Sequence, residues 1–176
     1  LRDRDVESII DELRFLHYEK GIMQIDWLDD DLLWNRDRAL LLFKRMTEEL
    51  PNLEWICNNG LIAAVIDEEL MEWMVRSGMK AFKVGIESGN NAMLKRIKKP
   101  TSKRKLMAVS PIFKKYPEVL CSGNYIIGFP NETFQEMLDT YELSRALNWD
   151  WASFYLCQPL KGTEMFSVFE NLDDER

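Results

Sequence analysis

Apolar residues follow two alternating patterns along the chain. In the longer segments they recur every three to four residues, as Val6, Ile9 and Leu13 do, which is typical of an amphipathic helix. Between these segments lie short apolar runs that have the length of a strand. The two patterns predict helices over residues 5–19, 35–50, 67–77 and 133–147, helical turns over 91–98 and 102–115, and strands over 22–28, 53–58, 81–86, 119–127 and 151–158.

The predicted strands begin about every 30 residues, which is the period of parallel βαβ units. Right-handed crossovers place such strands side by side, with the helices outside. We therefore expect an α/β fold of parallel strands with outer helices. The chain opens on a helix, and in a repeat of strand followed by helix this order predicts that a preceding strand and its loop are missing.

Composition narrows the class of protein. The chain has 176 residues, of which 46% are hydrophobic and 30% charged, as in a globular domain, and its formal net charge is −7. This acidic balance argues against unaided, nonspecific binding to nucleic acid or to anionic membranes, although Lys95–Lys105 forms a basic run. No apolar run reaches the roughly 18–20 residues that span a membrane, so we expect a cytoplasmic protein.

The cysteines do not form a metal site by their spacing. Cys57, Cys121 and Cys157 lie 64 and 36 residues apart, each in an apolar stretch. We interpret them as buried free thiols in a reducing compartment and expect no metal ligand in this chain. The tryptophans are expected to pack in the interior rather than to stack on a substrate; they are Trp27, Trp34, Trp55, Trp73, Trp149 and Trp151.

Polar side chains follow the predicted strands. In parallel α/β folds, functional sites lie at the carboxyl ends of the strands. Strand ends also meet solvent, so the pattern favours a site at this rim without specifying its chemistry. The residues concerned are Asp29, Asp30, Asn58, Asn59, Glu87, Ser88, Asn124 and Gln158.

Several stretches at these strand ends together resemble the radical S-adenosylmethionine (SAM) superfamily, and more narrowly its branch that often carries a cobalamin-binding domain. That branch includes methyltransferases and magnesium-protoporphyrin ester cyclases. The resemblance covers residues 5–165. It rests on Trp27-Leu28-Asp29-Asp30, Gly85-Ile86-Glu87-Ser88-Gly89, Met93–Lys99, Ile126-Ile127-Gly128-Phe129-Pro130-Asn131-Glu132-Thr133, and Pro159-Leu160-Lys161-Gly162-Thr163.

The resemblance implies a partial, TIM-like (β/α)6 barrel in which this chain supplies strands two to six as a single domain over residues 1–176. Two features depart from the family pattern. The Cys-x3-Cys-x2-Cys segment that follows the family's first strand is absent from this chain. Lys161 stands where the family has the second proline of Pro-x-Pro-Gly-Thr. By the family's mechanism the chain by itself does not ligate a [4Fe-4S] cluster and is expected to be inactive.

The resemblance also implies roles for single residues. Glu87 and Asn124 match positions that approach the ribose or methionine part of SAM, and Ser88 adjoins Glu87. Lys99 matches a basic position that meets the methionine carboxylate. The remaining candidates are Asp29 or Asp30 near the ammonium group, Asn58 or Asn59 in the same cavity, and Ile126 and Gly128 along the adenine.

For the parent protein, the resemblance implies an enzyme that cleaves SAM reductively at a [4Fe-4S] cluster, for methyl transfer or cyclisation on a small molecule. Cobalamin is left open as a further cofactor, and flavodoxin or ferredoxin is the expected reductant. The alternatives are a methylthiotransferase acting on transfer RNA or protein, a barrel without catalysis that serves as a binding module, and a barrel enzyme for phosphorylated sugars. Against the phosphorylated-sugar enzyme, this sequence has no glycine-rich phosphate-binding loop before a helix. An exposed strand edge also predicts a homo-oligomer.

Overall fold

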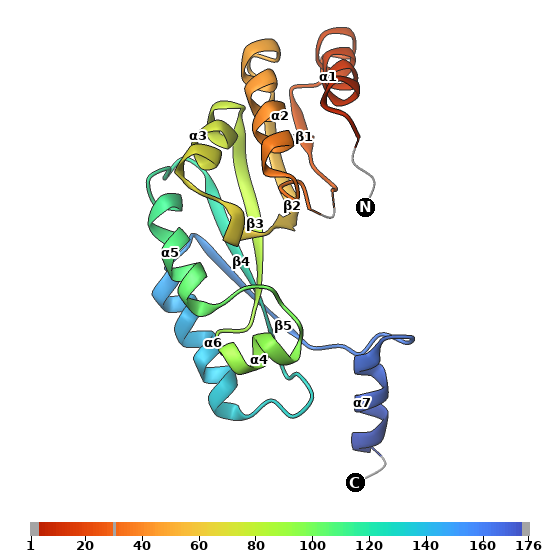
Figure 1. Ribbon diagram of the computed structural model, residues 1–176, viewed down its shortest axis with the longest axis vertical. Helices are drawn as coiled ribbons and strands as arrows, with labels where there is room; N and C mark the ends of the chain where they lie inside the picture. The colour runs from red at the N-terminus through yellow and green to blue at the C-terminus, as the bar shows by residue number, and fades with distance from the viewer. Residues whose placement is uncertain (1–3, 30, 174–176) are drawn as a thin grey trace.

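The computed structural model describes residues 4–29 and 31–173. Within them, one sheet of five strands has the order β1-β2-β3-β4-β5, and every neighbouring pair is parallel. Figure 1 shows the strands fanning along the long axis of the molecule. The strands are β1 (Gln24–Asp26), β2 (Glu54–Leu61), β3 (Met79–Glu87), β4 (Leu120–Ile127) and β5 (Trp151–Leu156).

Helices connect the successive strands and cover one face of the sheet. Figure 1 shows α2, α3, α5 and α6 along one side, whereas α7 stands apart at the carboxyl end. A π-helical turn over Phe15–Glu19 extends the first helix, and a 3-10 turn spans Ala63–Val65. The helices are α1 (Val6–Arg14), α2 (Arg36–Glu49), α3 (Glu68–Arg76), α4 (Asn91–Arg96), α5 (Lys103–Phe113), α6 (Phe134–Leu147) and α7 (Glu164–Asp173).

The predicted α/β fold with parallel strands and outer helices is confirmed. The first strand is shorter than predicted, because the Ile22 N–H bonds back to the Leu16 carbonyl at 3.0 Å and holds Ile22 at the end of the preceding helix. The helix α7 was not predicted from the sequence, although Met165, Val168 and Leu172 recur at helical spacing within it. None of the described helices, over residues 4–29 and 31–173, is both long and apolar enough to cross a membrane.

Side-chain caps fix where the helices start. Asn35 and Asp67 accept the N–H groups of Arg38 and Leu70, as expected of N-cap residues. Thr133 caps α6 in a reciprocal capping box with Glu136. Thr133, and not Asn131 two residues earlier, is therefore the N-cap of α6.

The buried core lies between the sheet and its covering helices. Trp55 is 1% exposed, stacks on Phe43 with ring centroids 5.3 Å apart, and donates its indole N–H to the Ser77 hydroxyl at 3.0 Å. Two of the tryptophans expected in the interior are instead exposed. Trp34 and Trp151 retain 62% and 63% of their accessible surface, and Trp151 lies on the sheet face opposite the helices.

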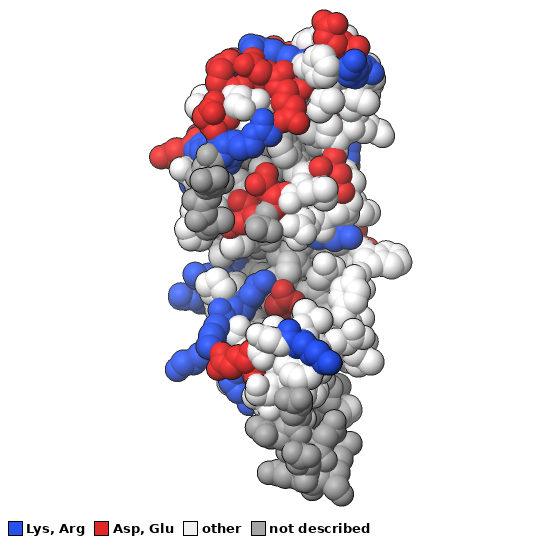
Figure 2. All heavy atoms as spheres, turned by 90° about the vertical axis from the view of Figure 1, so that its right-hand side faces the viewer, with Lys and Arg blue, Asp and Glu red and all other residues white. Residues whose placement is uncertain are grey.

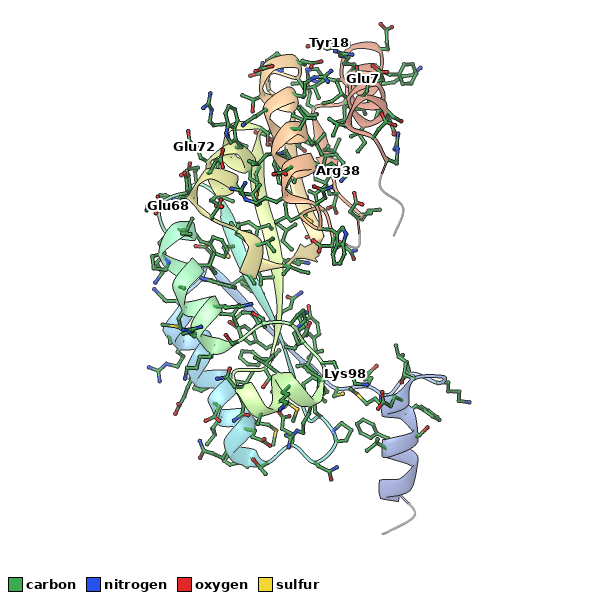
Figure 3. The ribbon with its side chains drawn as sticks, viewed as in Figure 1. Glu7, Tyr18, Arg38, Glu68, Glu72 and Lys98 are labelled. Atoms are coloured by element: carbon green, nitrogen blue, oxygen red, sulfur yellow. The ribbon has the colours of Figure 1, made fainter. Side chains whose placement is uncertain are left out.

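The first two helices are joined by charged side chains. Arg14 and Arg45 both pair with Glu49, and Arg45 also reaches Glu7 at 2.9 Å. Tyr18 donates its hydroxyl to the Glu49 carbonyl at 2.6 Å, and Figure 3 shows Glu7 and Tyr18 on the α1 side of this junction. Most of these side chains are exposed, so the pairs orient α1 on α2 more than they stabilise the fold.

The face of the sheet opposite the helices carries the polar residues that matter for function. Alternation along β3 buries Phe82 and Val84 under the helices, and places Lys83 and Gly85 on the other face. Parallel register then aligns two rows across neighbouring strands of this open face. One row is Lys83, Ser122 and Trp151, and the next toward the carboxyl ends is Gly85, Asn124 and Ser153.

Candidate functional site

An ion pair lies at the carboxyl end of β3, on the open face of the sheet. The Lys99 ammonium donates to Oε1 of Glu87 at 2.9 Å, and both side chains are half-buried. A Cβ on Gly85 would lie 2.9 Å from that Glu87 oxygen and 3.1 Å from the Lys99 nitrogen. Glycine at position 85 therefore makes the space in which this pair sits.

The backbone at Glu87 is strained. Its φ is +67°, and the Ser88 N–H bonds to the Ile86 carbonyl at 2.9 Å, so β3 ends in a γ-turn with a positive φ. This turn is rare for a residue with a side chain and costs on the order of 1–3 kcal/mol. It directs the Glu87 carboxylate back over Gly85 instead of out into solvent. Strain of this kind concentrates at functional sites.

Asn124 adjoins the ion pair from the next strand, because its Cα pairs with that of Gly85. Its Oδ1 is buried, and no hydrogen-bond donor reaches it from the residues that the structure describes. Buried acceptors in folded proteins nearly always have a partner. An acceptor left open beside a carboxylate and an ammonium group indicates a binding site for a ligand that supplies a hydroxyl or an N–H.

The loop after β4 completes this end of the sheet. Gly128 has φ +79°, and the N–H groups of Gly128 and Phe129 both donate to Oε2 of Glu132, at 2.6 and 3.1 Å. Burial raises the pKa of Glu132, while these two backbone bonds oppose the increase. Ile126, half-buried on the open face, precedes the loop.

Ser88 does not belong to the site. Its side chain is fully buried, its hydroxyl lies 3.2 Å from that of Thr140, and it accepts the Asn90 N–H at 3.1 Å. The structure therefore does not bring Ser88 to the Glu87–Lys99 pair. Successive side chains along a strand lie on opposite faces, and the Ser88 hydroxyl on the covered face connects the end of β3 to Thr140 of α6.

The rim at β1 and β2 differs in detail from the expected arrangement. Asn59 donates to the Asp29 carbonyl at 2.8 Å, so it holds the loop after β1. The acid at the strand end is Asp26, whose two oxygens accept the N–H and side-chain amide of Asn58 at 3.1 and 2.9 Å. Asp26 was not among the residues predicted for the site, because the first strand was expected to continue to residue 28. Asp30 lies outside the described residues.

The cysteines do not form a cluster site. Cys57 and Cys121 are buried and free, Cys157 is half-buried, and the described residues hold no group of three side chains that could bind a metal. Burial raises the pKa of all three thiols. The three thiols, held protonated and apart, do not fit an iron–sulfur cluster.

This arrangement predicts the order of thiol reactivity. In the folded protein at about pH 8, Cys157 is expected to react with Ellman's reagent first, and Cys57 and Cys121 only after unfolding, because they are buried and protonated. Mass spectrometry of timed samples identifies each modified thiol, and a denatured sample serves as control. Rapid reaction of all three thiols in the folded protein would contradict the buried positions.

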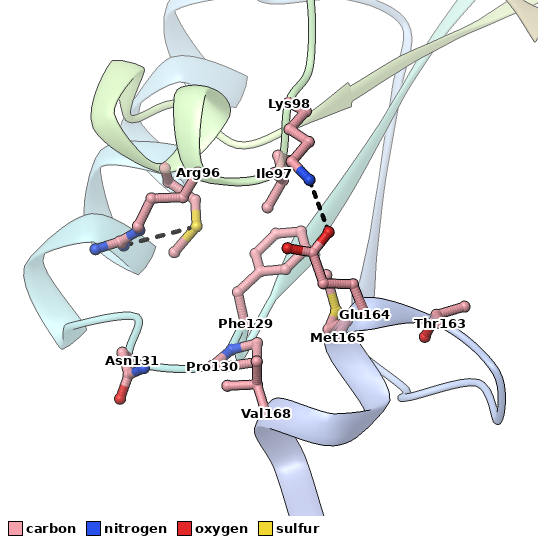
Figure 4. Close-up of a pocket in the computed structure, with 11 residues that line it drawn as sticks. Arg96, Ile97, Lys98, Phe129, Pro130, Asn131, Thr163, Glu164, Met165 and Val168 are labelled. Carbon is pink, nitrogen blue, oxygen red and sulfur yellow. Dashed lines mark hydrogen bonds and ion pairs between the residues drawn. The ribbon is translucent and has the colours of Figure 1, made fainter.

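A separate cavity of about 380 Å³ lies beside α7. Figure 4 shows Lys98 and Glu164 facing each other across its mouth, with Phe129 below them. The Lys98 ammonium nitrogen lies 2.7 Å from Oε2 of Glu164, and this exposed ion pair connects the end of α4 to the start of α7. None of Glu87, Lys99 or Asn124 lines this cavity, so we place the candidate site at the ion pair and the open acceptor.

The amino-acid sequence matches one family model and, among others, two relatives of known sequence. The Radical SAM superfamily model matches residues 1–144. An uncharacterized methyltransferase of Pyrococcus horikoshii is 31% identical over 173 residues, covering 97% of this chain and 37% of that protein. Cytidylyl-2-hydroxyethylphosphonate methyltransferase of Streptomyces wedmorensis is 33% identical over 175 residues, covering 94% of this chain and 32% of that protein.

A solved structure supports the fold. The radical S-adenosylmethionine methyltransferase TsrM of Kitasatospora setae, with cobalamin and a [4Fe-4S] cluster bound, superposes with a TM-score of 0.79 over 90% of this chain and 32% of its own, at 17% identity. The chain thus has the partial-barrel fold of this family and spans about a third of the length of these relatives. From the matched family model and the relatives above 30% identity, the chain belongs to the radical SAM superfamily of enzymes.

Proposed function

We propose that this chain binds S-adenosylmethionine on the open face of the sheet, at the carboxyl ends of β3 and β4. We further propose that it does so as part of a radical SAM methyltransferase of the cobalamin-dependent branch. The observation that carries the binding proposal is the unpaired Oδ1 of Asn124 beside the Glu87–Lys99 pair. The three groups fit a ligand that has hydroxyls, an ammonium group and a carboxylate.

Each group suits one part of this ligand. Lys99 lies where its ammonium group can exchange Glu87 for the methionine carboxylate, with a charge-assisted hydrogen bond. Glu87 and Asn124 then accept hydrogen bonds from the ribose hydroxyls or the amino group. Ile126 and Gly128 border the adenine. We also propose that Asp29, Asp30 and Asn59, near the carboxyl ends of β1 and β2 in the sequence, contribute to SAM binding.

When bound, SAM would supply an activated methyl group and, on one-electron reduction, radical chemistry. The residues of this chain orient it. The apolar side chain of Ile126 excludes water, and the Glu132-bound loop fixes the backbone at Gly128. The described residues contain no group of side chains that could ligate the reducing [4Fe-4S] cluster, so the chemistry of that cluster does not belong to them.

The relatives support the proposal of methyl transfer with cobalamin. Two proteins above 30% identity are named methyltransferases, and the superposed structure holds cobalamin. We therefore propose methyl transfer to a small molecule, cobalamin as cofactor, and flavodoxin or ferredoxin as electron donor. A cytoplasmic location accords with the free thiols. Self-association at the exposed edge of β1 stays a prediction.

Binding of SAM tests the proposal without requiring activity. Asn124→Ala is expected to weaken SAM binding about tenfold, because losing a hydrogen bond to a buried acceptor costs on the order of 1–3 kcal/mol. Equilibrium dialysis with labelled SAM measures the dissociation constant. The control is Asn91→Ala, an exposed amide at the start of α4 whose Oδ1 accepts the Lys103 N–H. No saturable binding to the wild-type chain up to about 5 mM, or equal loss in the control, would contradict the proposal.

A further inference from the structure

We propose that the middle of the open sheet face is a substrate subsite for a small molecule that carries an anionic group and a planar ring. Lys83 contacts the anionic group, and Trp151 stacks on the ring. This inference rests on the proposed function, because it places the substrate one row below the proposed SAM groups. It concerns residues that none of the family motifs contains.

Register brings the two residues onto one face. Lys83, Ser122 and Trp151 are aligned across β3, β4 and β5. The row above them holds Gly85, Asn124 and Ser153, two residues further along each strand, which corresponds to about 7 Å. A molecule on the lower row would therefore lie next to a ligand held by Asn124.

Lys83 is half-buried, and no carboxylate among the described residues lies within salt-bridge distance of its ammonium group. The acids of its own strand and of the two adjoining strands have other partners. Glu87 pairs with Lys99, and Glu54 pairs with Lys80 on the same strand as Lys83. A half-buried lysine without a counter-charge is poorly solvated. An anionic ligand supplies the missing charge, so charge complementarity specifies one end of the substrate.

Trp151 specifies the other end. Its ring is 63% exposed, and its indole N–H donates to the Ser153 hydroxyl at 3.0 Å, which holds the ring along the open face of β5. Tyr155, on the same face, is 52% exposed. Large aromatic surfaces left open next to polar groups are typical of binding sites, and a planar ring gains most from stacking on an indole.

The spacing of the two residues sets the size of the substrate. They are two strands apart, which is about 10 Å between backbones. Because the Lys83 side chain is flexible, its ammonium group can lie closer to Trp151 than the backbone distance. The row therefore fits a molecule of one ring with an acidic side chain better than it fits a macromolecule. A second copy of this chain over the face is the competing occupant.

A pair of matched probes tests the subsite. Indole-3-propionate has a ring and a carboxylate, and indole-3-propionamide is its neutral counterpart. Ligand-observed NMR titrations give the dissociation constant of each. We expect the wild-type chain to bind the acid about tenfold more tightly than the amide. Lys83→Met should abolish this preference, and Trp151→Leu should weaken both probes about equally, by threefold or more.

The chain offers a close control for each variant. Lys80→Met removes a lysine from the same strand, and Trp34→Leu removes a tryptophan with 62% exposure elsewhere. Neither control should alter the binding of either probe. Equal affinity for acid and amide in the wild type, an unchanged preference in Lys83→Met, or binding too weak to detect at about 10 mM would each overturn the proposal.

Titration of SAM into the same samples separates this inference from the proposed function. Lys83→Met should leave the affinity for SAM within about twofold. If SAM binds but the probes do not discriminate, the subsite is wrong and the SAM site stands. If SAM does not bind either, both proposals fail. Light scattering at the NMR concentration identifies a second copy as the occupant, and dimerisation that Trp151→Leu abolishes would also overturn the subsite.

Discussion

Trp55→Ala is expected to lower the free energy of unfolding by about 3–5 kcal/mol. This is the largest effect that we expect of a single substitution in the chain. The Trp55 side chain is 1% exposed and stacks on Phe43 at 5.3 Å, so truncation leaves a cavity between the sheet and α2. The change also leaves the buried Ser77 hydroxyl without the indole N–H that bonds to it at 3.0 Å.

Urea denaturation followed by circular dichroism measures this loss. Trp34→Ala provides the control, because that side chain is 62% exposed and its removal is expected to change the free energy of unfolding by less than about 0.5 kcal/mol. Similar losses in the two variants would contradict the assigned packing. A complete failure of Trp55→Ala to fold can be resolved with Trp55→Phe, which keeps the stacking and should lose less.

Gly89→Ala is expected to lower the free energy of unfolding by about 3 kcal/mol, the upper part of the usual range for overpacking. A Cβ at this position would lie 2.3 Å from the Asp139 carbonyl oxygen and 2.7 Å from the Thr140 Cα. Both are backbone atoms of α6, which cannot move aside as a flexible side chain would. The Gly89 N–H also donates to the Thr140 hydroxyl at 2.9 Å, and that bond would be strained.

The same substitution links packing to the site. A shift of residue 89 displaces the turn at Glu87, so we expect weaker SAM binding in Gly89→Ala as well as lower stability. Gly162→Ala is the control: its φ is +86°, which costs about 1 kcal/mol, but a Cβ there meets no atom within 4 Å. Thermal unfolding compares the two variants, and equal losses would contradict the close contact of position 89 with α6.

The sequence determined the order and type of most elements. The helical period of apolar residues and the spacing of strands of about 30 residues require neither contacts nor side-chain positions. Capping residues such as Asn35 and Asp67 act locally, so their roles were readable from the chain alone. The strand-end pattern also predicted Glu87 and Asn124 on one rim, because parallel strands end on the same side, whereas Lys99 was proposed only from the family resemblance.

The tertiary structure decided which of these residues meet. Whether Lys99 reaches Glu87 depends on the γ-turn at Glu87 and on the empty space at Gly85, and neither follows from a local pattern. Ser88 is next to Glu87 in the sequence, but its side chain is buried on the opposite face and lies 3.2 Å from the Thr140 hydroxyl.

Burial on the two faces of a strand was likewise decided by packing. Trp55 and Trp151 both lie in predicted strands, and only the position of the covering helices buries the first and leaves the second open. None of the described carboxylates forms an ion pair with Lys83, whereas Glu87, on the same strand, pairs with Lys99 from the segment after α4. Local sequence fixes periodicity, whereas long-range contacts fix which side chains share a face, a partner or a cavity.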